Sequence, residues 1–263
     1  MTPTTDTNSK AADDPGLDRV KKIMVGARNR GLPGLAQGGY TSGLVAEAVG
    51  TSAVEVSLRR PVPAERPLGL HTTGPGRVEL REGQTVLSEG VATDLEIDVP
   101  EAPSVEEALA ASERFPGRER HPVPGCYVCG TDDPDGRGLG IHPGPVGTRP
   151  LVAAIWAPPA VGEDSGRTPL EEIWAAFDCT QLWALIVHQE SRSGERAVTA
   201  RLATRVDRPV VPSLDHLLFG WPIGRRGDEF RAGAALIDGD GNLCAVGVQT
   251  AVRAKWGVPL GSV

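Results

Sequence analysis

Two stretches of the chain have the spacing of buried helices. In 170–187, apolar residues such as Ile173, Ala176 and Phe177 recur at intervals of three and four positions, which predicts a helix. Apolar side chains continue nearly all the way round it, so we expect it to be buried on most sides. A Gly-Gly pair opens a second predicted helix over 38–50. We expect 38–49 and 171–187 to form the two central helices of the fold.

Strand patterns follow each helix. After the first helix, Val54, Val56 and Leu58 alternate with polar residues, which is typical of a half-buried strand within 53–63. Alternation and β-branched residues predict further strands at 67–74, 77–84, 85–97, 197–212, 215–224, 229–242 and 243–256.

The chain therefore contains the same order of elements twice, a helix followed by four strands. An Arg-Pro pair closes the first strand of each copy, at Arg60-Pro61 and Arg208-Pro209. A helix that is apolar all round needs a sheet curled about it, so we predict an α+β double hotdog, with two antiparallel sheets each wrapped around a central helix. The predicted division is a loose N-terminal tail (1–18), an N-terminal half (19–112), a Gly/Pro-rich connection that includes the first strand of the second half (113–150), and a C-terminal half (151–263).

Composition narrows the class of protein. The 263 residues are 40% hydrophobic and 23% charged, as in ordinary globular proteins. A net charge of −7 argues against a broad nucleic-acid surface. No apolar run approaches the roughly 20 residues that a membrane span needs, and the N-terminus lacks the pattern of a secretory signal. With four cysteines, too few for a disulfide scaffold, a reducing cytoplasm is the expected location.

Alignment of the two copies shows where they differ. Asp178 stands opposite Gly39, Thr199 opposite Thr51, and Gln249 opposite Ala92. The second copy thus has Asp, Thr and Gln where the first has Gly, Thr and Ala. This asymmetry is what a duplicated scaffold with one set of catalytic residues would show.

Asp178 is an unusual residue for its place. Aspartate is a poor interior helix residue, and this one lies among Trp174, Phe177 and Trp183. A buried carboxylate needs hydrogen-bond partners or a raised pKa, and both suit a group that activates water. Two other interpretations stay open: a solvent-facing Asp near a helix bend, and a carboxylate bound to a neighbouring subunit.

These features resemble the acyl-CoA thioesterases of the double-hotdog type, the acyl-CoA thioesterase II-like group, over roughly 20–256. The resemblance rests on the Gly38-Gly39 helix start, Asp178 in the second helix, Thr199 in the next strand and Gln249 in the last strand. It implies hydrolysis by a water that Asp178 activates and that Thr199 and Gln249 hold. Backbone N–H groups of the glycine pair would stabilise the oxyanion. The alternative for the pair is a purely structural role, in which it lets the helix pack against a strand.

The resemblance also implies a substrate and an assembly. Acyl-CoA would be the small-molecule partner, coenzyme A being part of the substrate, so we expect no separate cofactor. A homo-oligomer is expected because hotdog sheets commonly extend across subunits. Two other functions stay open: acyl-CoA hydration or dehydration, for which His188 is too far along the helix from Asp178, and acyl-CoA binding without catalysis. Arginines near the predicted site are candidates for the CoA phosphates: Arg59, Arg60, Arg205, Arg208 and Arg253.

Other motifs are weaker. Cys126 and Cys129 form one CxxC motif, which has zinc-ligand character. Because no second CxxC follows, we predict a tight turn without a metal. A redox pair is a further alternative. Ser213, Asp215 and His216 are neighbours on alternating faces and cannot form a triad. The run Asp238-Gly-Asp-Gly-Asn predicts a hairpin turn rather than a calcium loop.

Overall fold

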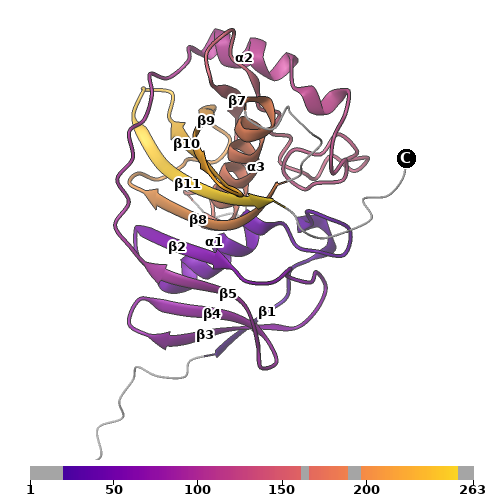
Figure 1. Ribbon diagram of the computed structural model, residues 1–263, viewed down its shortest axis with the longest axis vertical. Coiled ribbons are helices and arrows are strands. Elements are labelled where there is room, and N and C mark those ends of the chain that lie inside the picture. The colour runs from indigo at the N-terminus through magenta and orange to yellow at the C-terminus, as the bar shows by residue number, and fades with distance from the viewer. Residues whose placement is uncertain (1–19, 161–165, 189–196, 254–263) are drawn as a thin grey trace, which may run out of the picture.

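The computed structural model describes residues 20–160, 166–188 and 197–253. Both predicted central helices are confirmed, as α1 (Gly38–Val49) and α3 (Leu170–His188). The two helices run antiparallel where they cross: Gly39 lies against Trp174 and Ala175, and Gly43 lies against Glu171. Figure 1 shows the sheet curving past α1 in the lower half of the molecule and past α3 in the upper half.

Within the described ranges the strands form one antiparallel sheet of eleven, in the order β1-β3-β4-β5-β2-β8-β11-β10-β9-β7-β6. Their bounds are β1 Val20–Ile23, β2 Ala53–Leu58, β3 Leu68–Gly74, β4 Arg77–Glu82, β5 Thr85–Ala92, β6 Gly144–Pro145, β7 Val152–Trp156, β8 Ala197–Val206, β9 His216–Arg226, β10 Glu229–Ile237 and β11 Leu243–Arg253.

The prediction of two separate sheets is corrected by the pairing of β2 with β8. Ala53 pairs with Arg205 and Ser57 with Arg201, so the sheets of the two halves join into one. The physical reason is that each half alone would leave a strand edge with unpaired N–H and C=O groups, and the two edges satisfy each other. The α+β class and the antiparallel arrangement are as predicted.

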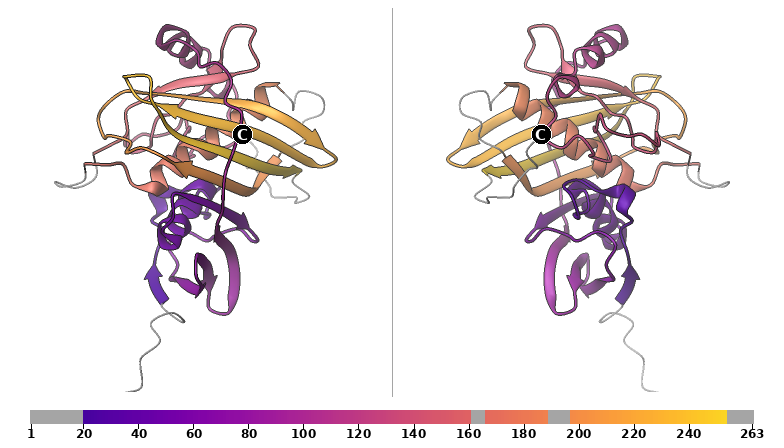
Figure 2. Two further views of the ribbon diagram at one scale, coloured as in Figure 1. Left: turned by 90° about the vertical axis from the view of Figure 1, so that its left-hand side faces the viewer. Right: turned by 90° about the vertical axis from the view of Figure 1, so that its right-hand side faces the viewer.

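Several elements escaped the sequence analysis. The largest is α2 (Val105–Glu113), which begins with a capping box between Ser104 and Glu107. Its buried residues Ala108 and Ala111 pack into a cluster with strands β7 and β9. This helix belongs by sequence to the predicted N-terminal half but packs on the second half, at the end far from α1 (Figure 2). The strands β1 and β7 and two short 3₁₀ helices (Ala27–Asn29 and Pro116–Arg118) were also not predicted, whereas β6 lies in the connection 113–150 where the first strand of the second half was expected.

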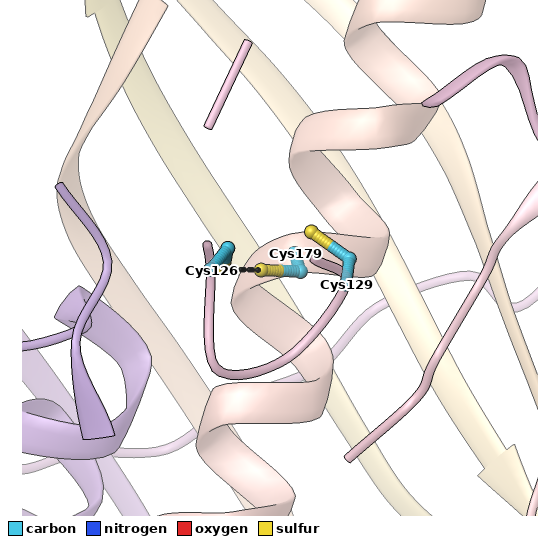
Figure 3. Close-up of side chains that lie close together, drawn as sticks. All are labelled: Cys126, Cys129 and Cys179. Carbon is cyan, nitrogen blue, oxygen red and sulfur yellow. Dashed lines mark hydrogen bonds between the residues drawn. The ribbon is translucent and has the colours of Figure 1, made fainter. Parts of the chain in front are cut away.

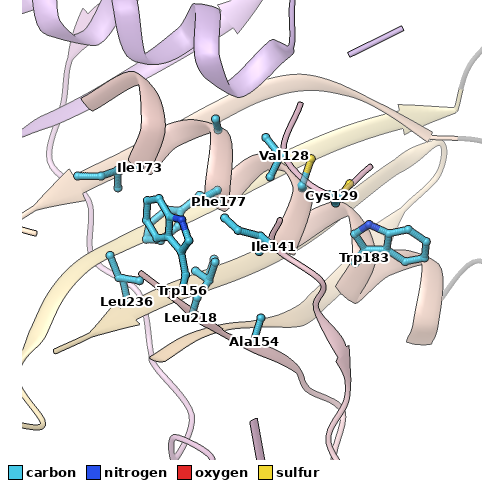
Figure 4. Close-up of a cluster of buried hydrophobic side chains, with 14 of the residues drawn as sticks. Val128, Cys129, Ile141, Ala154, Trp156, Ile173, Phe177, Trp183, Leu218 and Leu236 are labelled. Atoms are coloured by element: carbon cyan, nitrogen blue, oxygen red, sulfur yellow. The ribbon is translucent and has the colours of Figure 1, made fainter. Parts of the chain in front are cut away.

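Each central helix has its own hydrophobic cluster. Figure 4 shows the larger one, in which Phe177 of α3 packs with Trp156 and Leu236 from the sheet. The other surrounds α1 and includes Val45 and Leu80. Side chains on most sides of α3 are buried, in agreement with the apolar pattern that predicted this helix.

Two glycines of α1 allow the helices to cross closely. A Cβ atom at Gly43 would lie 2.3 Å from Glu171 Cα, and one at Gly39 would lie 2.3 Å from the Trp174 carbonyl oxygen. Such distances are far inside van der Waals contact, so only glycine fits. The structural role considered for the glycine pair is therefore present at Gly39, although its neighbour is a helix and not a strand.

Candidate active site

Asp178 lies where the middle of α3 meets the N-terminus of α1, and it is 3% exposed. Its Oδ1 accepts hydrogen bonds from Thr199 Oγ1 and Gln249 Nε2, both at 2.6 Å. Its Oδ2 accepts from Gln37 Nε2 at 2.6 Å and from the Gly39 backbone N–H at 3.0 Å. A carboxylate has about four acceptor sites, so this buried group is fully hydrogen-bonded.

The structure thus brings together the three predicted residues Asp178, Thr199 and Gln249. Gln249 is fully buried on β11 and also donates to Thr199 Oγ1 at 2.9 Å. The three side chains and the start of α1 form one connected polar network in an otherwise apolar interior. Networks of this kind hold their members in fixed positions.

An irregularity in strand β8 turns Thr199 toward the helices. Gln249 pairs with Leu202 and Thr250 with Arg201, but Ala251 pairs with Thr199, which leaves one extra residue on β8. Paired residues share a face of the sheet, so Thr199 shares the face of Ala251 and Gln249. Without this bulge Thr199 would pair one position later and point away from Asp178.

Burial governs the acidity of Asp178. Loss of water around the carboxylate raises its pKa to about 6, against the lowering effect of the hydrogen bonds from Thr199, Gly39 and Gln37. Desolvation wins because the group is cut off from solvent on all sides. The site therefore holds a carboxyl group that is a stronger base than an exposed aspartate.

The glycine pair differs from its predicted role in one respect. The N–H of Gly39 is bound to Asp178, so it is not available as an oxyanion donor. The N–H of Gly38, the first in α1, has no acceptor among the described residues. Of the two predicted donors, only Gly38 remains a candidate.

Gln37 is a site residue that the sequence analysis missed. Its Oε1 caps α1 by accepting from the Tyr40 N–H at 2.6 Å, and its Nε2 donates to Asp178. One side chain therefore fixes both the start of α1 and the orientation of the carboxylate. The signal in the sequence was its place directly before the glycine pair, which is the N-cap position of the predicted helix.

One polar atom of the network lacks a partner. Gln249 Oε1 is buried and no donor of the described residues reaches it. A rotation of the amide would satisfy nothing, because Nε2 already donates to Asp178 and Thr199. Buried acceptors normally have a partner, so this oxygen is a candidate acceptor for a substrate or solvent group.

The predicted arginines divide into two groups. Ser57 of β2 pairs with Arg201 of β8, so Arg59, two residues further on, lies at the level of Thr199. Arg205 lies six residues along β8 from Thr199, which is about 20 Å in an extended strand, and Arg208 lies further still. Arg205 and Arg208 therefore lie toward the other end of the strand from Asp178, and their contact with CoA phosphates stays a prediction.

The individual contacts of these arginines agree with surface roles. Arg59 forms an ion pair with Glu89 at 2.8 Å, and Arg60 is exposed next to it. Arg253, on the last strand, forms an ion pair with Asp228 at 3.3 Å.

The remaining motifs lie apart from Asp178. Ser213 lies in a turn with a positive φ of 62°, and the His216 ring contacts the Leu214 carbonyl, so the excluded triad is absent from the described residues. The turn at Asp238 is a hairpin in which Asp238 Oδ1 accepts from the backbone N–H groups of Asp240 and Asn242. Cys126 and Cys129, in contrast, do lie near Asp178, because both approach Cys179.

Two open cavities of about 330 and 490 Å³ lie at the opposite end of the helix pair. Both are lined by Glu47 of α1 and by Arg167 and Leu170 at the start of α3. Neither includes Asp178. The chemistry of the carboxylate and its network, rather than the size of a cavity, identifies the candidate active site. No described helix is long and apolar enough to span a membrane.

Comparison with known proteins supports the architecture. No protein family model and no curated protein matches the sequence. Among solved structures, a TesB protein of Mycobacterium avium subspecies paratuberculosis matches with a TM-score of 0.56 and 14% identity, over 90% of this chain and 93% of that one. The acyl-CoA thioesterase II TesB2 of Mycobacterium marinum matches with a TM-score of 0.55 and 15% identity, over 90% and 94%. The dehydratase domain of a mycocerosic acid synthase-like PKS matches with a TM-score of 0.58 and 15% identity, over 93% of both chains. A protein of Alicyclobacillus acidocaldarius described as having a hot dog fold matches with a TM-score of 0.54 and 13% identity, over 90% and 94%. The chain therefore has a hotdog fold, and the predicted resemblance to the acyl-CoA thioesterase II-like group is confirmed at the level of the fold.

Proposed function

We propose that the protein hydrolyses a thioester, with acyl-CoA as the substrate class and with water activated by Asp178. The observation that carries the proposal is the buried carboxylate, which receives hydrogen bonds from Thr199, Gln249 and the start of α1 at the same time. A raised pKa and a fixed orientation are the two properties that a general base needs. The thioesterase names among the structural neighbours point to the same chemistry.

In the proposed reaction, a water molecule binds between Asp178 and the unpartnered Oε1 of Gln249. Both carboxylate oxygens already accept two hydrogen bonds, so the water approaches from Thr199, the half-buried member of the network, and replaces its contact. Asp178 takes one proton as the water oxygen attacks the thioester carbonyl. The tetrahedral intermediate then expels the CoA thiolate, which recovers the proton, and the carboxylic acid is released.

The negative oxygen of the intermediate needs preorganised donors. The Gly38 N–H is proposed for this role, because it begins α1 and no acceptor of the described residues occupies it. The positive end of the helix dipole adds to its effect. Arg59 and Arg60 are proposed to meet CoA phosphates, since they lie at the same end of the sheet as Thr199.

Hydration or dehydration of an acyl-CoA is the second candidate, favoured by the dehydratase domain among the structural neighbours. That chemistry requires a histidine paired with the acid. No histidine of the described residues donates to Asp178, and the His188 ring contacts the Leu151 carbonyl at 3.1 Å. Hydrolysis therefore fits the site better.

The test is turnover of a panel of acyl-CoA esters with short, medium and long chains. Free coenzyme A is measured by chromatography, because a thiol dye would also react with the protein's own cysteines. A parallel reaction with a 2-enoyl-CoA is analysed for the 3-hydroxyacyl product. Catalytic release of coenzyme A supports the proposal, a hydroxyacyl product without release selects the hydratase, and binding without either reaction selects an acyl-CoA-binding protein.

A further inference from the structure

Three cysteine sulfurs converge beside the candidate active site. Cys126 and Cys129 lie on the loop before β6, and Cys179 follows Asp178 on α3, as Figure 3 shows. All three Sγ atoms lie within 4.8 Å of one another, and those of Cys126 and Cys179 are 3.7 Å apart. The loop and the helix are separated by about fifty positions in the sequence, so only the fold brings the third thiol to the CxxC motif.

The loop has a conformation suited to presenting its sulfurs. The Gly130 N–H donates to the Cys126 carbonyl at 2.9 Å, which closes a tight turn around the motif. A Cβ atom at Gly130 would lie 2.4 Å from that same oxygen, so the turn requires glycine.

One of the sulfurs also contacts the network around Asp178. Gln37 Nε2 lies 3.6 Å from Cys179 Sγ, so the side chain that donates to Asp178 also reaches the cysteine cluster.

We propose that Cys126, Cys129 and Cys179 bind one zinc ion. With Zn–S bonds of about 2.3 Å in tetrahedral geometry, the sulfurs would lie about 3.8 Å apart, close to the 3.7 Å between Cys126 and Cys179. This replaces the prediction of a metal-free CxxC, which depended on the lack of further ligands in the sequence. The proposal does not rest on the thioesterase function.

No fourth His, Cys, Asp or Glu ligand atom of the described residues joins this group. His121 and His142 flank the motif; their Nδ1 atoms contact the Val123 N–H and Arg118, while their buried Nε2 atoms have no partner among the described residues. The fourth ligand would therefore be a water molecule or, after a movement of its ring, one of these histidines. The ion would attach the loop to α3 next to Asp178, a stabilising and positioning role.

The test is the metal content of the full-length protein, purified under reducing conditions without a polyhistidine tag. Elemental analysis should find about one zinc per chain. Cys179→Ser should lose most of this zinc, and Cys244→Ser is the matched control, because Cys244 is also buried but lies outside the cluster. Wild-type protein exchanged into Co²⁺ should show the thiolate-to-metal charge-transfer absorption of a tetrahedral site, a measurement that does not depend on the folding of any variant.

Two results would overturn the proposal. One is reduced wild-type protein that contains no zinc and gives no thiolate absorption with Co²⁺. The other is equal zinc content in Cys179→Ser and Cys244→Ser, both folded, which would place the metal elsewhere. Mass spectrometry of protein purified without reductant adds a third outcome: a disulfide within the cluster, with no metal uptake after reduction, would also contradict a zinc site and identify a redox pair instead.

Discussion

The two ends of the helix pair have the same framework but different chemistry. At one end, Asp178 of α3 faces the start of α1 and is almost completely buried. At the other end, Glu47 of α1 lies near the start of α3, where it is exposed and lines an open cavity. Both ends therefore place an acidic residue near the beginning of the opposite helix.

What differs is the set of groups around each acid. Asp178 receives hydrogen bonds from Thr199 and Gln249. The counterpart of Thr199, Thr51, instead donates to the Ala53 carbonyl at 2.9 Å, and the counterpart of Gln249 is Ala92. An acid near a helix start is thus not enough: converging donors and exclusion of water distinguish the candidate site from the opposite end of the helix pair.

The substitution with the largest expected effect at the candidate site is Asp178→Asn. The substitution keeps the shape but removes the basic oxygen, so we expect hydrolysis of the best acyl-CoA to fall by about 10² to 10⁴-fold, measured as kcat. Glu47→Gln is the matched control at the opposite end and should leave kcat unchanged. A folded Asp178→Asn protein with near wild-type kcat would contradict the proposed mechanism while leaving the fold intact.

Gln249→Ala removes the other main donor to the carboxylate. A hydrogen bond to a charged group contributes about 1.5–3 kcal/mol, so we expect kcat to fall by roughly 10- to 100-fold. The substrate KM should change less, because Gln249 is proposed to hold water and not the acyl group. A change confined to KM would instead make Gln249 a substrate contact.

Gly43→Ala tests the close crossing that joins the two ends. Its Cβ atom would overlap the Glu171 backbone, so we expect the free energy of unfolding to fall by about 1–3 kcal/mol, measured by denaturant titration. Gly224→Ala is the control, since a Cβ atom there meets nothing within 4 Å. Equal effects at the two positions would show that the helix spacing is not what glycine provides.

Thr199→Ala should lower kcat less than Asp178→Asn or Gln249→Ala does. We expect a loss of about tenfold, which corresponds to one hydrogen bond of about 1–1.5 kcal/mol. The bulge that directs Thr199 inward is a backbone feature and should persist. If Thr199→Ala proves as damaging as Asp178→Asn, the hydroxyl takes part in proton transfer and does not merely orient the carboxylate.

Thr51→Ala gives the smallest expected change. Thr51 bonds only to its own strand, so kcat should stay within about twofold of wild type. A loss comparable with that of Thr199→Ala would mean that the first half also retains an active site.

Much of this molecule was predictable because its signals are local. The apolar spacing of 170–187 and the alternation after Gly50 depend only on neighbouring residues, and both gave elements within a few residues of those observed. Comparison of the two copies also singled out Asp178, Thr199 and Gln249, since a polar residue in an apolar pattern is visible without a structure. The short α2 was missed because its apolar stripe is brief, although Ser104 and Glu107 form a capping box that is visible in the sequence.

The sequence by itself therefore determined the two helices, the strand-rich duplicated architecture and the three residues worth testing. Only the tertiary structure decided how they meet. It joined the two sheets through β2 and β8, bound the Gly39 N–H to Asp178, turned Thr199 inward through a bulge, placed Arg205 at the far end of its strand and brought Cys179 to the CxxC motif. Each of these depends on strand register or on a contact between distant segments, and local patterns specify neither, because register and long-range contact are settled by the packing of the whole chain.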